Sequence, residues 1–359
     1  MPGGMTPELP RYTSQQDGFL ESAFEKRGLK LEIGAPVTGA VPAGGTVAVT
    51  SGDGTVRFFH PENGPTTRQA HDGAVLCLVA HADGVLTGGD DGRFLRILID
   101  GRIEEVANFG PRWIDCVASG HEHYACSAGR MVHIWRKNKA TAISLEHAST
   151  IGGLAFDTTG KRLAVAHYGG TTIWTRGERR WKSSKLVWKG SHGTVTFSPD
   201  GKFLVTSMQE NALHGWHLRD KEHMAMQGYP AKIKSFAWVG DIPHLVTSGA
   251  NEAICWPFDG NYGPMGRSPL CVAHDSAHLV TCVQSLNEKN AVFVGFQDGT
   301  VLLAALNDNK ESIVIRGSTG AEVTAIAVTK SLSHVLIGDA QGNVLWTRLW
   351  AGGTDERIV

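Results

Sequence analysis

The chain has 359 residues, of which 42% are hydrophobic and 19% are charged, and its formal net charge is −1. This composition excludes wholesale disorder, and the charge excludes a global field that would draw the protein to nucleic acid or anionic lipid. No apolar run reaches about 18 residues and no signal-peptide pattern opens the sequence, so we expect a cytoplasmic protein without a membrane span. The 44 glycines are about 12% of the chain against a usual ~7%, which predicts a β protein with many tight turns.

Residues 1–29 are predicted to form an N-terminal arm. Asp17 is a suitable N-cap for a short helix that follows it. Four apolar side chains would give this helix one apolar stripe: Phe19, Leu20, Ala23 and Phe24. Such a stripe either docks against the rest of the protein or binds a partner protein, and we favour docking.

One unit recurs through the rest of the chain. Each copy is a pair of apolar strands joined by a turn of small residues, which is the signature of a hairpin. The copies span 47–59, 85–98, 124–135, 163–174, 203–216, 245–256, 292–306 and 335–346. Their spacing, about 41 residues, matches the ~40–45 residues of a four-stranded propeller blade. An apolar run precedes each hairpin and a more polar edge strand follows it, so each repeat has the four strands that a blade needs.

We therefore predict an all-β fold, a single closed β-propeller of four-stranded antiparallel blades. Eight repeats favour eight blades, with seven blades as the alternative. The last blade lacks its fourth strand, which residues 28–34 (GLKLEIG) can supply. Closing the ring in this way removes exposed sheet edges. Residues 30–350 would then form the propeller, including this N-terminal closing strand, and residues 351–359 a C-terminal tail.

The repeats resemble those of the WD-repeat family. FSPDGKFLVTS (197–207) and FDTTGKRLAVA (156–166) are similar to the inner hairpin of that family. A Trp ends the third strand in five repeats: Trp135, Trp174, Trp216, Trp256 and Trp346. The Gly-His and Trp-Asp dipeptides are missing from the repeat positions, so the repeats are degenerate. The resemblance implies a buried structural network, best preserved at His71, Thr87 and Asp91.

The best candidate for a metal site is the group Cys116, His121, His123 and Cys126. The predicted hairpin places the two thiols mid-strand and the imidazoles near the tip, on the order of 13–17 Å away at ~3.3 Å per residue. Zinc needs its ligands within about 2.0–2.3 Å. We therefore expect core thiols and exposed histidines, with no metal site; a surface pair of His121 and His123 would bind a metal weakly at most.

The sequence carries no motif for nucleophilic catalysis or phosphate binding. It has neither a Gly-x-Ser-x-Gly elbow nor a Walker-type loop. His71, Thr87 and Asp91 have the residue types of a catalytic triad, but the resemblance implies that they form a buried brace. We therefore expect a protein that is not an enzyme and needs no cofactor.

One segment, 176–189, is strongly basic. Its six basic residues against one acid, Glu178, give a local charge of six minus one, or +5. The candidate contact residues in it are Arg176, Arg179, Arg180, Trp181, Lys182 and Lys185. Interleaved tryptophans suit base stacking beside phosphate contacts. The other interpretation, which we favour, is a solvated outer hairpin whose tryptophans pack on their own blade.

The resemblance implies a partner-binding surface on the face that carries the inter-blade loops and the turns between second and third strands. The turn residues on this face are Asp90, His167, Gln209, Gln297 and Asp339. The residues that start inner strands there are Arg112, Trp113, Lys232, Lys234 and Glu322. Arg112 and Trp113 are the first choice, because exposed Trp and Arg supply much interface energy. Alternatively, Trp113 packs between blades.

These observations favour a non-enzymatic scaffold that binds protein partners in a cytoplasmic complex and is monomeric on its own. This function rests on fold analogy. The alternative is a nucleic-acid or ribonucleoprotein-associated module that uses the basic segment 176–189. A further alternative, an accessory protein in metal handling, rests only on the 16 histidines.

Overall fold

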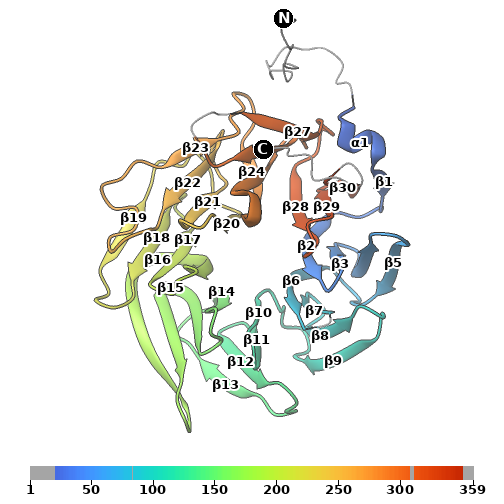
Figure 1. Cartoon of the computed structure of the whole chain (residues 1–359). Coiled ribbons are helices and arrows are strands. Elements are labelled where there is room, and N and C mark those ends of the chain that lie inside the picture. Colours follow the sequence, from blue (N-terminus) through green and yellow to red (C-terminus); the bar gives the residue numbers. More distant parts are fainter. Residues whose placement is uncertain (1–20, 83, 308–310, 351–359) are drawn as a thin grey trace, which may run out of the picture.

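A computed structural model describes residues 21–82, 84–307 and 311–350. The predicted cap Asp17, the apolar residues Phe19 and Leu20, and the predicted tail 351–359 lie outside the described residues. Thirty β-strands of the described chain are arranged as a ring of sheets (Figure 1). No helix in these ranges is long and apolar enough to cross a membrane.

The strands fall into seven antiparallel sheets, which are the blades of a β-propeller. The first three blades are β2 (Val37–Ala43), β3 (Thr46–Ser51), β4 (Thr55–His60) and β5 (Gly64–Gln69); β6 (Val75–His81), β7 (Gly84–Gly89), β8 (Arg93–Leu98) and β9 (Ile103–Asn108); and β10 (Val117–Ser119), β11 (His123–Ala128), β12 (Met131–Arg136) and β13 (Ile143–Glu146). A six-stranded sheet follows, with β14 (Ile151–Phe156), β15 (Arg162–Arg176), β16 (Trp181–Phe197), β17 (Phe203–Met208), β18 (Leu213–His217) and β19 (His223–Met226).

The remaining blades close the ring. They are β20 (Phe236–Val239), β21 (His244–Thr247), β22 (Ala253–Pro257) and β23 (Leu270–Val272); then β24 (Val280–Leu286), β25 (Ala291–Phe296), β26 (Val301–Ala305) and β27 (Ser312–Arg316), with the 3-10 turn η1 (Asn287–Lys289) after β24; and finally β28 (Val323–Val328), β29 (His334–Asp339), β30 (Asn343–Arg348) and β1 (Leu29–Glu32).

The expectation of eight blades is wrong, and the alternative of seven matches the structure. Repeats four and five share the six-stranded sheet. β15 holds both strands of the fourth hairpin, and the chain reverses at Gly169 and Gly170, whose φ of +86° and +132° glycine adopts without strain. The Arg176 N–H donates to the Lys161 carbonyl at 2.9 Å, which holds the two ends of β15 together. β16 then pairs with β15 through its first part and with β17 through its last part, so no gap separates the repeats.

The last blade joins the two ends of the chain. β1 pairs antiparallel with β30, with Leu29 opposite Trp346 and Glu32 opposite Asn343. The short helix α1 (Ala23–Arg27) precedes β1, and a capping box formed by Ser22 and Glu25 starts it. The helix is thus capped five residues later than predicted from Asp17.

The apolar residue of α1 docks on the propeller. Phe24 is buried in the same cluster as Phe293 and Ile337. Its carbonyl accepts a hydrogen bond from the Thr347 hydroxyl at 2.8 Å. Of the two alternatives for the arm, docking is the one that the described residues adopt.

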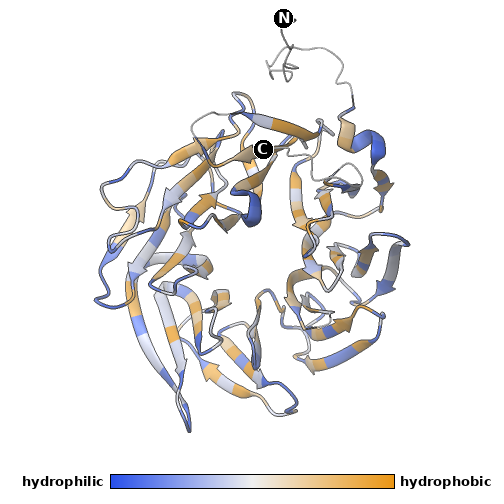
Figure 2. Cartoon of the chain, in the orientation of Figure 1, coloured by the Kyte–Doolittle hydropathy of each residue, from blue (hydrophilic) through white to orange (hydrophobic). Residues whose placement is uncertain are grey.

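The core is divided among layers between neighbouring blades. Second strands such as β3 and β29 are buried along their whole length, whereas the outer strand β5 is mostly exposed. Figure 2 shows the same distribution, with apolar residues along the strands and hydrophilic residues at many of the turns. This layering leaves the turns at the two ends of the ring as the surface where function can differ between propellers.

Candidate functional site

Two large aromatic side chains stand out on the face predicted to bind a partner. Trp113 is 63% exposed and Tyr168 is 67% exposed. Trp113 precedes β10, the first strand of its blade, and Tyr168 lies at the turn of β15, after the second strand of its blade. In an antiparallel blade the start of the first strand and the end of the second strand lie at the same edge of the sheet. The two residues are therefore expected on the same face of the ring. The blades of these two residues are neighbours, since the Ile151 N–H donates to the Gly129 carbonyl.

Trp113 is exposed because its neighbour takes the buried position. Ile114 is fully buried, and its N–H donates to the Gly89 carbonyl at 3.0 Å, which fixes this segment to the preceding blade. The alternative that Trp113 packs between blades is therefore wrong. Arg112 is also exposed beside it. Tyr168 was not among the predicted site residues, although an aromatic residue directly before the Gly169–Gly170 turn is the signal that identifies it.

Four of the predicted residues form contacts between blades. Lys234 Nζ lies 2.7 Å from Glu322 Oε1, and these residues belong to blades that are separated by the blade of β24. Lys232 Nζ donates to Gln209 Oε1 at 3.1 Å. Lys232, Lys234 and Gln209 are exposed and Glu322 is half-buried, so these surface contacts add little stability.

The other predicted residues of this face differ in their exposure and in their hydrogen bonds. Asp90 is half-buried near Gly73, and the exposed Gln297 accepts a hydrogen bond from the Leu279 N–H through its side chain. His167 is half-buried and points back into its own blade, with Nε2 2.9 Å from the Thr172 hydroxyl.

Asp339 does not lie on the accessible surface, which corrects its assignment to the partner-binding face. The residue is fully buried, and its carboxylate accepts hydrogen bonds from the Gln341 and Asn343 N–H groups and from the Thr319 hydroxyl. It also faces Arg316, with 3.5 Å between Nη1 and Oδ2. The cause is its position at the end of β29, where its carboxylate bonds the backbone N–H groups of the turn that follows.

The structure brings His71, Thr87 and Asp91 together in the blade of β6. His71 Nδ1 lies 2.9 Å from Asp91 Oδ1, and Nε2 lies 2.9 Å from the Thr87 hydroxyl. Burial lowers the pKa of His71 although Asp91 opposes the shift, so the neutral ring donates through Nδ1 and accepts from Thr87. Thr87 is fully buried, and this group connects an inter-blade loop to a turn.

Similar contacts recur in the degenerate repeats, in one case with another residue type. His192 Nδ1 lies 2.7 Å from the Thr206 hydroxyl, in a fully buried contact. In the blade of β20 a tyrosine takes this role: the Tyr229 and Thr247 hydroxyls are 2.7 Å apart, and the Trp256 indole N–H donates to the Tyr229 oxygen at 2.6 Å. The family pattern did not identify Tyr229, because it marks the position only by histidine.

The candidate metal group is not assembled. No cluster of three or more His, Cys, Asp or Glu residues suited to a metal occurs in the described ranges. Cys126 is buried opposite Val117, and burial raises the pKa of its thiol well above the usual range. His123 is buried rather than exposed, because its ring packs edge-on against Trp181 with 5.4 Å between ring centroids. The predicted surface pair of His121 and His123 is therefore wrong.

The basic segment has exposed charges but no exposed tryptophan. Arg179, Arg180, Lys182 and Lys185 are exposed, whereas Arg176 pairs with Glu122 at 2.7 Å. Trp181 is buried against the strands of two blades. Trp188 is half-buried and stacks on His214 with 4.1 Å between centroids. The favoured interpretation, in which these tryptophans pack on the protein, matches the structure, and the alternative of base stacking would need ring faces that already contact other side chains.

No family model matches the chain, and no curated protein matches its sequence. Solved structures match it in fold. The computationally designed Ika8 protein has a TM-score of 0.71 at 16% identity, over 89% of this chain and 98% of that one. The WD40 repeats of RRP9 have a TM-score of 0.59 at 12% identity, over 78% of this chain and 96% of that one. The fold is a β-propeller similar to a WD40 repeat domain.

Proposed function

We propose that this protein is a degenerate member of the WD-repeat family and a non-enzymatic scaffold for a cytoplasmic protein complex. The likeness to the WD40 repeats of RRP9 supports the family assignment at the level of the fold. A closed ring that presents many turns on one face suits the binding of protein partners, and this step is an analogy between folds. The ring needs no second copy to close, which supports a monomer on its own.

The exposure of Trp113 and Tyr168 on one face is the observation that carries the proposal. Trp, Tyr and Arg are the residue types that most often dominate the binding energy of an interface. Here Arg112, Trp113 and Tyr168 lie on neighbouring blades, and the polar pairs Lys234–Glu322 and Lys232–Gln209 lie on the same face. Aromatic anchors with a polar surround form the usual anatomy of a protein–protein interface.

The burial of Thr87 supports a non-enzymatic role. A nucleophile must reach the atom that it attacks, whereas Thr87 is fully buried and His71 bonds it to Asp91. The three residue types of a catalytic triad are thus used to hold a loop.

Two double variants test the surface. Arg112→Ala/Trp113→Ala should lose the partner in a pull-down from the native cytoplasm, while Arg179→Ala/Arg180→Ala should retain it. The two variants each remove exposed side chains, so both should fold normally. Loss of the partner from only the second variant would place the interface on the basic segment. If nuclease treatment also abolished that binding, the nucleic-acid alternative would replace the scaffold.

A further inference from the structure

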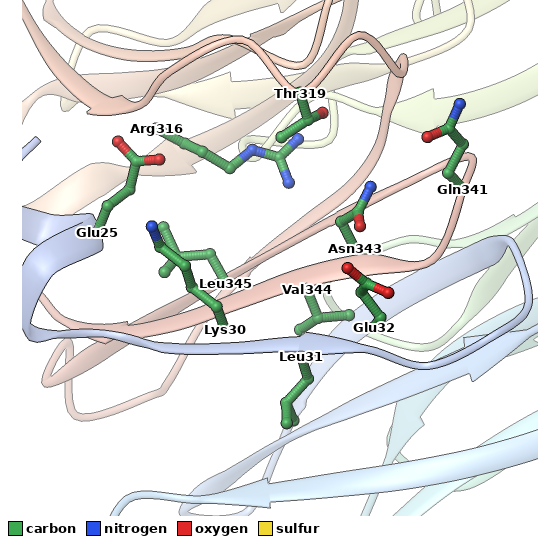
Figure 3. A pocket seen from close by; sticks show the side chains of 10 residues that line it. All are labelled: Glu25, Lys30, Leu31, Glu32, Arg316, Thr319, Gln341, Asn343, Val344 and Leu345. Atoms are coloured by element: carbon green, nitrogen blue, oxygen red, sulfur yellow. The ribbon is translucent and has the colours of Figure 1, made fainter. Parts of the chain in front are cut away.

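Two features of the molecule lie outside the proposed partner-binding face: a pocket beside the closing strand and an open sheet edge in the basic segment. The pocket is lined by residues of α1, β1, β27 and β30 (Figure 3). Its Arg316 is 3% exposed and pairs with the buried Asp339, so this pair connects two neighbouring blades inside the protein. The open edge, in contrast, presents groups that a partner can reach.

The first part of β16, residues 181–187, has one edge that no strand covers. This stretch pairs with β15, from Trp181 opposite Arg176 to Val187 opposite Gly170. Within the described chain nothing pairs with its other edge, since β16 reaches β17 only from His192 onward. Figure 1 shows the hairpin of β15 and β16 projecting outward from the ring. The backbone N–H and C=O groups of this edge are therefore open to pairing with another extended chain.

The side chains of this stretch leave room for a further strand on both sides of the sheet. Successive side chains of a strand point to opposite sides, and Lys182, Ser183, Ser184 and Lys185 are all exposed. Val187 is 75% exposed, although an apolar side chain is more stable when it is covered. A strand laid along this edge would cover Val187 without meeting a buried side chain in the middle of the stretch.

The charge of the edge determines which strand suits it. The exposed cations on and beside it are Arg179, Arg180, Lys182, Lys185 and Lys189, against a single acid in the segment. A second copy of this chain, paired antiparallel about the centre of the stretch, would place Lys182 opposite Lys185, and like charges in that position are unfavourable. An acidic strand would place carboxylates opposite the same lysines, which is favourable. The edge thus opposes self-association and selects an acidic partner.

Nucleic acid matches this edge less well than an acidic peptide does. A single nucleic-acid strand gains affinity by stacking its bases on aromatic rings, whereas Trp181 and Trp188 contact other side chains of the protein. Phosphates accept hydrogen bonds from N–H groups but cannot donate to the C=O groups that also line a sheet edge. A peptide backbone pairs with both kinds of group.

We propose that the edge 181–187 binds an acidic, extended segment of a partner protein by strand addition. The backbone of the segment pairs with the edge, its carboxylates face Lys182 and Lys185, and an apolar side chain covers Val187. The tip of this hairpin lies at the end of the strands opposite to Tyr168, so the edge is separate from the partner-binding face.

Two synthetic peptides of equal charge test the proposal against the purified full chain. The first, Ac-VTETTETEE-NH2, places Glu opposite Lys185 and Lys182 and Val opposite Val187 in an antiparallel alignment. The second, Ac-VPEPPEPEE-NH2, keeps every charge, but its prolines cannot form a strand ladder. Fluorescence anisotropy at about 0.1 M salt, where the Debye length is about 10 Å, should show that the first peptide binds at least about tenfold more tightly than the second. The proposal is overturned if the first peptide does not bind, or if the second binds equally well.

Two further readings separate strand addition from attraction between charges alone. Amide hydrogen exchange in residues 181–187 should slow when the first peptide is bound, because edge N–H groups become hydrogen-bonded. Unchanged exchange in a complex that does form would contradict the proposal. A single-stranded oligonucleotide with the same number of charges should bind less tightly than the first peptide, and tighter binding would favour nucleic acid instead.

A matched pair of charge-reversal variants tests the two lysines. Lys182→Glu/Lys185→Glu should weaken binding of the first peptide by about tenfold or more, because carboxylates then face carboxylates. Lys26→Glu/Lys330→Glu makes the same change of charge at exposed positions across the ring, on α1 and between β28 and β29, and should leave the affinity nearly unchanged. The unfolding transition of each variant checks that it is folded. Equal losses in both variants would show that only net charge matters and would overturn the proposal.

The variant Arg112→Ala/Trp113→Ala keeps this test independent of the proposed function. It should bind the first peptide as the unsubstituted protein does, because both side chains lie on the partner-binding face. Loss of peptide binding in this variant would place the peptide on that face and contradict the assignment to the edge.

Discussion

Individual histidines hold this propeller together in a neutral form. His71 and His192 bond threonine hydroxyls, and burial lowers the pKa of both rings. His214 is an extreme case: it is fully buried between aromatic rings, and neither ring nitrogen has a hydrogen-bond partner within the described chain. Neutral imidazole tolerates such a site, whereas imidazolium does not, so these residues connect the stability of the protein to pH.

We expect the protein to lose stability as the pH falls below about 6.5. Burial lowers the pKa of His214 to about 3 and that of His147 to about 4, whereas a histidine in an unfolded chain titrates near 6.5. Between these values the unfolded state binds more protons, so the free energy of unfolding falls with pH by up to about 1.4 kcal/mol per pH unit for each such histidine. Above pH 6.5 both states are neutral and the effect vanishes.

The variant His214→Phe isolates one of these contributions. Urea unfolding between pH 6.5 and pH 4.5 should show a shallower loss of stability than in the unsubstituted protein, by up to about 1.4 kcal/mol per pH unit. His121→Phe, at an exposed turn, should keep the original slope. Identical slopes for all three proteins would mean that His214 is protonated in the folded state.

At the scale of the element, the hairpins were predictable from the sequence and their grouping into sheets was not. Alternating apolar residues and glycine turns mark each hairpin, and residues 28–34, predicted to close the ring, contain β1. The merging of repeats four and five depends on the single strand β16, which pairs with β15 after the reversal at Gly169 and Gly170 and then with β17. A glycine pair predicts a turn in either case, so the sequence does not distinguish separate blades from a continuous sheet.

Deleting residues 1–35 should strongly destabilise the protein. The deletion removes β1, which exposes the edge of β30, and it removes the buried Phe24. The loss of a buried phenylalanine alone costs about 3–5 kcal/mol. We expect a much lower melting temperature or aggregation, measured by thermal unfolding and light scattering.

A shorter deletion provides the matched control. Removing residues 1–20 leaves the capping box of α1, the contacts of Phe24 and the whole of β1 in place. Its melting temperature should match that of the full chain. A stable monomer after the longer deletion would show that β30 does not need β1.

At the scale of the whole molecule, the repeat pattern predicts which residues lie in the turns, but not which of these residues are exposed and which are buried. The repeat pattern placed Trp113, Lys234 and Glu322 on one face; in the structure Trp113 is exposed and Lys234 pairs with Glu322. It also placed Asp339 there, because a repeat pattern gives the order of strands but not the direction of a side chain at the end of a strand.

The charge distribution of the whole molecule limits what the basic segment can do. The net charge of −1 gives no general attraction to phosphates, so binding would rely on five exposed side chains of the segment: Arg179, Arg180, Lys182, Lys185 and Lys189. Five phosphate contacts on a single strand correspond to a slope of about −3.5 in a plot of log K against log salt concentration. Without exposed tryptophans this contact has no stacking contribution.

We therefore expect a single-stranded oligonucleotide to bind weakly, and only at low salt. Fluorescence anisotropy across a salt series should give a slope of about −3.5 or shallower, and Arg179→Ala/Arg180→Ala should reduce its magnitude by roughly two-fifths. Trp188→Phe should leave the affinity unchanged, because the indole stacks on His214 inside the sheet and not on a base. Binding that persists at physiological salt, or that falls with Trp188→Phe, would show that bases reach this ring, and it would make nucleic acid the partner of this propeller.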